Sequence, residues 1–163
     1  MLTTTQLDNL RALIEGLAES GKDVPTSVSQ LPDFPYSNFS NLMADFKAED
    51  AWLLRFSYAM DPSLLSLLGS GALKLKSNIG MLLAYGGPVV ALVLCFVFSW
   101  WFLVAIPICL SWGMSLTKQA YNSAIFRAAF SDEIAFCFLY FIGQVSLRIL
   151  GTDEQFYYKH VDT

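Results

Sequence analysis

The chain has 163 residues, of which 55% are hydrophobic and only 15% are charged, and its formal net charge is −4. An ordinary soluble domain is about 45 to 50% apolar and about 25% charged, so this composition, with a mean hydropathy of +0.47, favours a membrane protein over a soluble or a disordered chain. The 10 lysines and arginines form no basic block, which leaves a nucleic-acid partner without electrostatic support.

Residues 1–21 are predicted to form an amphipathic N-terminal helix. Thr5 and Asp8 have the spacing of a capping pair, and Gly21 is typical of a helix end. The apolar face consists of Leu7, Leu10, Ile14 and Leu17, at intervals of three and four residues. Such a helix could dock on the protein's own core, on a protein partner or on the membrane surface. Because the polar face is acidic, we expect protein contact rather than an anionic membrane, with these four residues as the partner-binding face. The stretch has no continuous apolar core, so no cleavable signal peptide is expected.

Residues 22–41 are predicted to be a Pro-rich linker, because three prolines among Ser, Thr and Asn resist regular structure. The aromatic residues of this segment indicate that it lies across a protein surface. Residues 42–76 are predicted to form cytoplasmic or interfacial helices, beginning with an amphipathic helix over about residues 42–60. Asp61 followed by Pro62 then predicts a new helix, with aspartate as N-cap and proline as first helical residue.

Residues 77–117 carry no formal charge, and these 41 residues are predicted to form a transmembrane hairpin. A bilayer core about 30 Å thick needs about 20 helical residues per crossing, so the run holds nearly two crossings. We place the spans at about residues 79–98 and 101–117, with the tryptophans of the turn at the far interface. Lysines flank both ends of the run, so both termini are expected in the cytoplasm, at the plasma membrane or a bacterial inner membrane.

Two other arrangements fit the same run. A single span from about Pro88 to Leu110 would follow a break at Gly86 and Gly87, but it leaves many apolar residues outside the bilayer core. A shallow wedge that enters and leaves one leaflet would suit the short second arm. The turn is the least supported part of the hairpin prediction, because Ser99-Trp100-Trp101 contains none of the usual turn residues Gly, Asn and Pro.

Small side chains recur at helical spacing on one face of each arm of the hairpin. Such faces let two helix backbones approach closely enough for dispersion to hold them together in lipid. The residues are Gly80, Ala84, Gly87 and Ala91 on the first arm and Ala105, Cys109 and Gly113 on the second. The pattern predicts packing of one arm on the other. A subunit interface or a pore lining is the alternative interpretation.

Residues 118–163 are predicted to form a cytoplasmic helical region, with helices over about residues 120–130 and 133–149. The apolar part of the second helix is 14 residues long, which is more typical of a buried or interfacial helix than of a third span. Asp132 and Glu133 resemble an N-cap region with an acidic first turn. The expected fold class is an all-α integral membrane protein: a two-span helical hairpin with amphipathic helices packed as a small cytoplasmic layer.

The sequence offers little material for catalysis. It has no Gly-rich phosphate loop, no nucleophile elbow and no pair of histidine ligands, and His160 is its single histidine. The three cysteines, Cys95, Cys109 and Cys137, lie in apolar runs at spacings that match neither a zinc site nor a disulfide framework. We therefore expect no enzyme, no cofactor and no metal site.

Two functions remain, and both have the lipid bilayer as a partner. In the first, the chain is a membrane-anchored adaptor or assembly subunit that binds a protein partner through its cytoplasmic helices. In the second, it is a membrane-active effector of toxin-like or defence type, whose hairpins form a homo-oligomer that perturbs the bilayer. An apolar hairpin lacks the polar stripe of an aqueous pore, which favours the adaptor.

Overall fold

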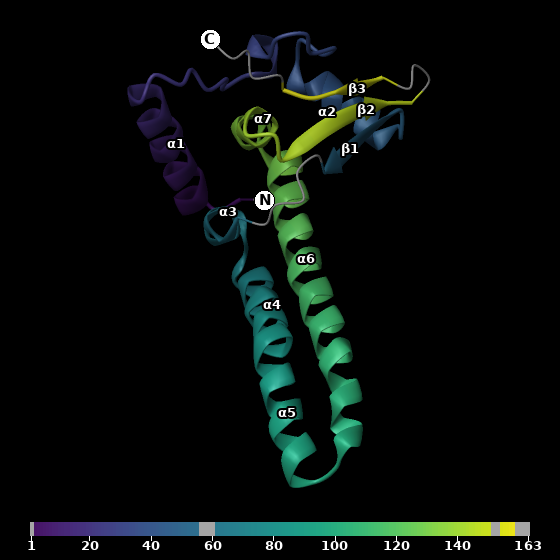
Figure 1. Ribbon diagram of the computed structural model, residues 1–163. Coiled ribbons are helices and arrows are strands. Elements are labelled where there is room, and N and C mark those ends of the chain that lie inside the picture. Colours follow the sequence, from purple (N-terminus) through teal and green to yellow (C-terminus); the bar gives the residue numbers. More distant parts are fainter. Residues whose placement is uncertain (1, 56–60, 151–153, 159–163) are drawn as a thin grey trace. The chain divides into compact units, whose positions relative to one another are not determined.

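The fold is that of a computed structural model, in which residues 2–55, 61–150 and 154–158 are described. This part of the chain is mostly helical, as expected, with three short strands that were not expected (Figure 1). It divides into two compact units. The sheet unit comprises Met1–Ala59 and Ile125–Thr163, and the hairpin unit comprises Met60–Ala124. The hairpin unit is therefore an insertion between two segments of the sheet unit.

The N-terminal helix α1 spans Thr4–Glu19 in the sheet unit and ends close to the predicted position. A capping box holds its first turn: Thr3 Oγ1 accepts from the Gln6 backbone N–H at 3.3 Å, and Gln6 Oε1 accepts from the Thr3 N–H at 3.0 Å. The helix was correctly predicted, but its cap is this pair rather than Thr5 and Asp8.

The predicted linker lies across the sheet unit and contains one short 3-10 helix, η1, at Val28–Gln30. The Ser27 hydroxyl and the backbone N–H that follows it both donate to Glu133 Oε1 at 2.8 Å. The ring of Phe34 packs edge to face against Tyr140, with ring centroids 5.2 Å apart. These contacts confirm that the aromatic residues of the linker rest on a protein surface.

The amphipathic helix predicted over residues 42–60 is much shorter than predicted. Helix α2 spans Phe39–Lys47, and strand β1 follows at Ala51–Arg55; residues 56–60 lie outside the described residues. Glu49, with φ +62°, adopts the left-handed conformation directly after the helix and ends it. The prediction was wrong because the apolar residues of β1 fit a helical stripe as well as a strand, and their pairing partner is remote in sequence.

The helix predicted over residues 133–149 is correct in its first part only. Helix α7 spans Glu133–Phe141, and its side chains from residue 135 onward are buried, so it is a core helix of the sheet unit. Gly143, with φ +68°, ends it in a Schellman motif in which the next backbone N–H bonds to the Leu139 carbonyl at 2.9 Å. Strand β2, Val145–Ile149, replaces the predicted last turns.

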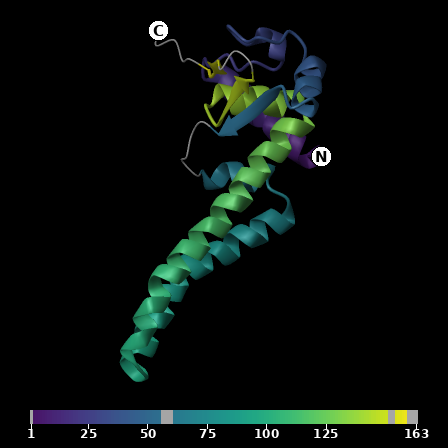
Figure 2. The same cartoon turned by 90° about the vertical axis from the view of Figure 1, so that its right-hand side faces the viewer.

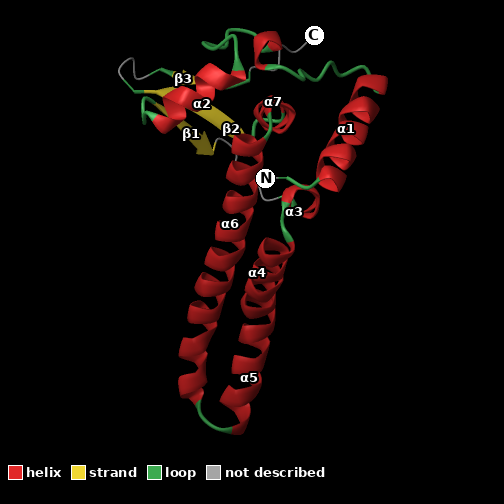
Figure 3. Cartoon of the chain, turned by 180° about the vertical axis from the view of Figure 1, so that it is seen from behind, coloured by secondary structure: helices red, strands yellow, loops and turns green. Residues whose placement is uncertain are grey.

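The three strands form an antiparallel sheet of order β1-β2-β3, with β3 at Gln155–Phe156 (Figure 3). Strands β1 and β2 pair from Ala51 opposite Ile149 to Arg55 opposite Val145. This pairing joins the two segments of the sheet unit that the hairpin unit separates in sequence. Strand β1 is consequently at an edge of the sheet.

The first arm of the hairpin unit is a series of helical segments. Asp61 caps the short helix that precedes it, since its Oδ1 accepts from the Ser63 N–H at 2.9 Å, as the Asp-Pro pair predicted. The segments are α3 at Pro62–Leu68, α4 at Gly71–Met81, a π-helical turn η2 at Leu82–Gly86, and α5 at Gly87–Val97. The π-helical turn directly precedes Pro88, which has no N–H to donate and so favours an irregular turn before it.

The chain reverses at Phe98 and Ser99, where the hairpin turn was predicted. Ser99 is extended (φ −168°, ψ 145°), a conformation open to any residue, so the turn needs no glycine. The 3-10 helix η3, Trp100–Val104, leads into helix α6, Ala105–Ser131, which runs beside α4 and α5 (Figure 2). A continuous single span from Pro88 to Leu110 is therefore wrong.

Two helical stretches are long and apolar enough to cross a membrane. They are Gly71–Val97, with 27 residues, and Trp100–Ser131, with 32 residues. Of the most apolar 18 residues of each stretch, 17% are buried in the first and 6% in the second. The core helix of a soluble protein is mostly buried. Helix α7, with nine residues, is about 14 Å long and cannot provide a third crossing.

Candidate functional site

The two arms of the hairpin unit meet through small residues of the predicted face. A Cβ atom at Gly80 would lie 2.7 Å from the Gly113 carbonyl oxygen, and one at Gly113 would lie 2.5 Å from Ala84 N. Real Cβ atoms do not approach other atoms so closely, so these positions accept no larger side chain unless the backbone moves. The prediction overlooked Thr117, whose hydroxyl donates to the Gly113 carbonyl at 3.0 Å.

Nearer the turn, the two arms are less closely packed along this face. A Cβ atom at Gly87 would lie 2.8 Å from Cys109 Cβ, so the arms still touch there. Ala91 and Ala105 instead line an apolar groove of about 560 Å³ between the arms. Five of the seven predicted small residues thus lie in close contact. Two of these five, Gly87 and Cys109, also line the groove together with Ala91 and Ala105. Because each arm covers the small residues of the other, subunits could join through this face only if the arms separated.

The outer surface of the hairpin unit is strongly apolar. Of the 26 large hydrophobic side chains that are exposed in the described chain, 21 lie between Leu75 and Met114. The exposed fraction reaches 88% at Phe96, 73% at Leu82 and 69% at Trp112. Exposed apolar side chains gathered on one part of a protein are typical of a surface that contacts lipid or protein.

Helix α1 does not offer the predicted partner-binding face. Leu10 is fully buried and Ile14 is 7% exposed, while Leu7 and Leu17 are half-buried. The helix lies against α7 within the sheet unit. The expectation that these residues are exposed on a tethered helix is therefore wrong for Leu10 and Ile14, because the linker is anchored and the apolar face is covered by the chain itself.

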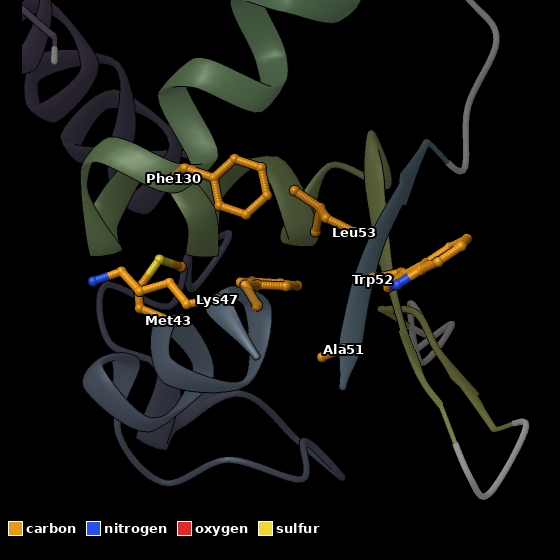
Figure 4. A pocket seen from close by; sticks show the side chains of 7 residues that line it. Met43, Lys47, Ala51, Trp52, Leu53 and Phe130 are labelled. Atoms are coloured by element: carbon orange, nitrogen blue, oxygen red, sulfur yellow. The ribbon is translucent and has the colours of Figure 1, made fainter. Parts of the chain in front are cut away.

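A groove lies beside strand β1 in the sheet unit. Its volume is about 470 Å³, and it is lined by Met43, Phe46, Lys47, Ala51, Trp52, Leu53 and Phe130. Figure 4 shows Leu53 pointing toward Phe130, whereas Trp52 points to the opposite side of the strand. The rings of Phe46 and Phe130 pack edge to face with centroids 5.0 Å apart. Lys47 is the one charged residue of the lining.

The groups of the sheet unit whose pKa values shift most hold their protons. Burial raises the pKa of the Cys137 thiol to about 12, and nearby carboxylates add to the rise. Burial also raises the pKa values of Tyr140 and Tyr36. The Tyr36 hydroxyl donates to Asp45 Oδ2 at 2.6 Å, which raises its pKa further. These side chains are protonated near neutral pH and supply no activated nucleophile or base.

In the described part of the chain, no three His, Cys, Asp or Glu side chains gather as a metal site, and His160 lies outside it. Comparisons with known protein families, with curated proteins and with solved structures found no match to this chain. The candidate functional surfaces are the apolar outside of the hairpin unit and the groove beside β1.

Proposed function

We propose that this protein is a membrane-anchored adaptor or assembly subunit, whose hairpin unit inserts into a lipid bilayer and whose sheet unit binds a protein partner. The apolar outer surface of the hairpin unit carries the proposal. Burying one large apolar side chain contributes about 1.5 to 3 kcal/mol. Leaving 21 of them in water would therefore cost tens of kcal/mol, against a typical domain stability of about 5 to 15 kcal/mol. Lipid removes that cost.

The charges and tryptophans at the two ends of the hairpin unit support an orientation. Lys74, Lys76 and Lys118 lie at the end remote from the turn, and Trp100 and Trp101 lie at the turn. Positive charge favours the cytoplasmic side and tryptophan favours the interface. With two crossings, both termini are cytoplasmic, and the sheet unit meets its partner there.

The groove beside β1 is the proposed partner-binding surface. An edge strand offers main-chain donors and acceptors to an added strand, and a neighbouring pocket can receive one of its side chains. The lining is apolar apart from Lys47, so we propose an extended partner segment with an apolar side chain for the pocket and an acidic residue for this lysine.

A membrane-active effector receives less support. Oligomerisation through the small-residue faces would require the arms to separate from contacts such as Gly80 with Gly113. The groove between the arms is lined by apolar residues alone, which does not favour an aqueous path.

A charge in the middle of the first arm tests membrane anchoring. Val89 is 61% exposed, so Val89→Arg would be harmless in water, but an arginine at the centre of a span costs about 2.5 to 3.5 kcal/mol. We expect Val89→Arg to lower the amount of protein that alkaline carbonate leaves in the membrane pellet. Leu75→Arg, also exposed but next to two lysines, is the matched control and should stay in the pellet. Wild-type protein in the soluble fraction would refute the proposal.

A second experiment tests the partner site in intact cells. A photo-crosslinking residue at Met43, which lines the groove, should give a discrete crosslinked protein band. Phe130→Glu should abolish the band, because it places a carboxylate in the apolar groove. Leu13→Glu, at an exposed apolar residue of α1, should keep it. The adaptor proposal fails if Phe130→Glu keeps the band, or if expression of the wild-type chain collapses the membrane potential.

A further inference from the structure

A cavity of about 400 Å³ lies between α3, α4 and α6 in the hairpin unit, near the lysines and away from the turn. Helix α4 contributes Lys74, Ser77 and Asn78 to its wall, and Thr117 and Tyr121 come from α6. No Asp or Glu side chain is among the residues that line it. The cavity therefore has one formal charge, and that charge is positive.

Three hydrogen-bond donors of α4 line this cavity and have no hydrogen-bond partner in the part of the chain that the structure describes. Lys74, Ser77 and Asn78 have the i, i+3, i+4 spacing of one helix face. Among the described residues, the Lys74 ammonium, the Ser77 hydroxyl and the Asn78 amide make no hydrogen bond or ion pair. Ser77 is only 4% exposed as a residue, and it lines the cavity. A bound anion would accept hydrogen bonds from these three donors, and the positive charge of Lys74 would strengthen its own.

The wall changes from polar to apolar along the arm. Met81 and Tyr85 lie nearer the turn along the same arm and line the same cavity. A smaller cavity of about 50 Å³ shares these two residues and is also lined by Ala84 and Met114. An occupant with an anionic end and an apolar chain would match this order of groups.

We propose that this cavity binds an anionic phospholipid, with its phosphate at Lys74, Ser77 and Asn78 and one acyl chain along Met81 and Tyr85. In the inserted hairpin the three donors lie beside the end of the uncharged run, at the depth of lipid headgroups. The apolar continuation is what favours a lipid over free phosphate. This inference rests on membrane insertion of the hairpin and is independent of the partner site on the sheet unit.

The test uses the full chain purified in an uncharged maltoside detergent. Dioleoyl phosphatidylglycerol is titrated into the micelles, and binding is followed by native mass spectrometry and by the midpoint of thermal unfolding. We expect saturable binding of phosphatidylglycerol and a raised midpoint. Dioleoyl phosphatidylcholine, with the same chains and no net charge, should have little effect. Lys74→Gln should weaken phosphatidylglycerol binding about tenfold, the size expected for one charge-assisted hydrogen bond, and Ser77→Ala should weaken it less.

Lys76→Gln is the matched control, because Lys76 is two residues away, donates to Gln119 Oε1 at 3.1 Å and does not line the cavity. It should bind phosphatidylglycerol as the wild type does. Equal losses in the two lysine variants, or equal effects of the two lipids, would overturn the site. An equal rise of the midpoint with inorganic phosphate alone would overturn the lipid assignment. Carbonate extraction of Val89→Arg tests anchoring without touching Lys74, so the two proposals can fail separately.

Discussion

Helices α1, α2 and α7 all end on a residue in the left-handed conformation. Two of these residues are glycines, Gly21 with φ +82° and Gly143 with φ +68°. The third is Glu49, with φ +62°. A left-handed residue with a side chain costs roughly 1 to 2 kcal/mol, and glycine avoids this cost. The C-terminus of α2 is therefore a strained position, held by the sheet pairing that begins two residues later.

We expect Glu49→Gly to stabilise the protein by about 0.5 to 1 kcal/mol, because relief of the left-handed strain exceeds the added chain entropy of the unfolded state. The midpoint of thermal unfolding of the sheet unit should rise. Glu15→Gly, the same substitution inside α1, should lower the stability by about 1 kcal/mol. A decrease for both variants would show that Glu49 is not strained.

Cys137 is fully buried in α7, and its pKa is raised from 9.0 to about 12. In a chain whose other cysteines, Cys95 and Cys109, are changed to alanine, we expect a thiol reagent at pH 8 to label Cys137 only as the protein unfolds. Because the folded state holds this proton more tightly than the unfolded state, the group favours folding below pH 9, and this contribution is lost between pH 9 and about 12. Rapid labelling without denaturant would contradict the burial.

At the level of elements, the two arms of the hairpin unit pack by contact between backbones rather than between large side chains. Gly113 is the tightest position, since a Cβ atom there would overlap the Gly80 carbonyl oxygen and lie 2.5 Å from Ala84 N. Gly86, on the other arm, has only ordinary space around it, with the nearest atom, Leu82 Cδ1, at 3.6 Å. Two glycines of the same hairpin therefore differ in what a methyl group would meet.

We expect Gly113→Ala to destabilise the hairpin unit by about 1 to 3 kcal/mol, since backbone atoms must move to admit the methyl group. Gly86→Ala should be neutral or stabilise by up to about 1 kcal/mol, because alanine favours a helix. Thermal unfolding in detergent compares the two variants. Equal midpoints would mean that the arms do not pack closely at Gly113.

Some boundaries of helices could be predicted from the sequence because the residues that set them lie at the boundary itself. Asp61-Pro62 identified the start of α3, and the apolar run with its flanking lysines identified the hairpin and the place of its turn. The end of α7 carried a local signal too, since Gly143 precedes a stretch of alternating apolar and polar residues, but the helical pattern before it was extended too far. No comparable signal marks the end of α2, because Glu49 is an unusual left-handed residue.

For the whole molecule, the proposed topology places both termini on one side of the membrane. We expect self-labelling tags at the N-terminus and after Thr163 of the full chain to react with a membrane-impermeant dye only after the membrane is opened. The physical reason is the pair of crossings, which returns the chain to the lysine-rich side. If one tag reacts in intact cells and the other does not, the chain crosses an odd number of times and the hairpin topology fails.

The hairpin and its packing face could be predicted from the sequence alone, because their causes are local. An uncharged run of 41 residues needs no distant partner to be recognised, and small residues at helical spacing keep one face whatever the helix packs against. The sheet unit could not be predicted, because its pairs are remote: Ala51 meets Ile149 across the whole inserted hairpin unit. Only tertiary structure decides such pairings, and only it decides that the apolar stripe of α1, equally suited to a partner, is covered by this chain itself.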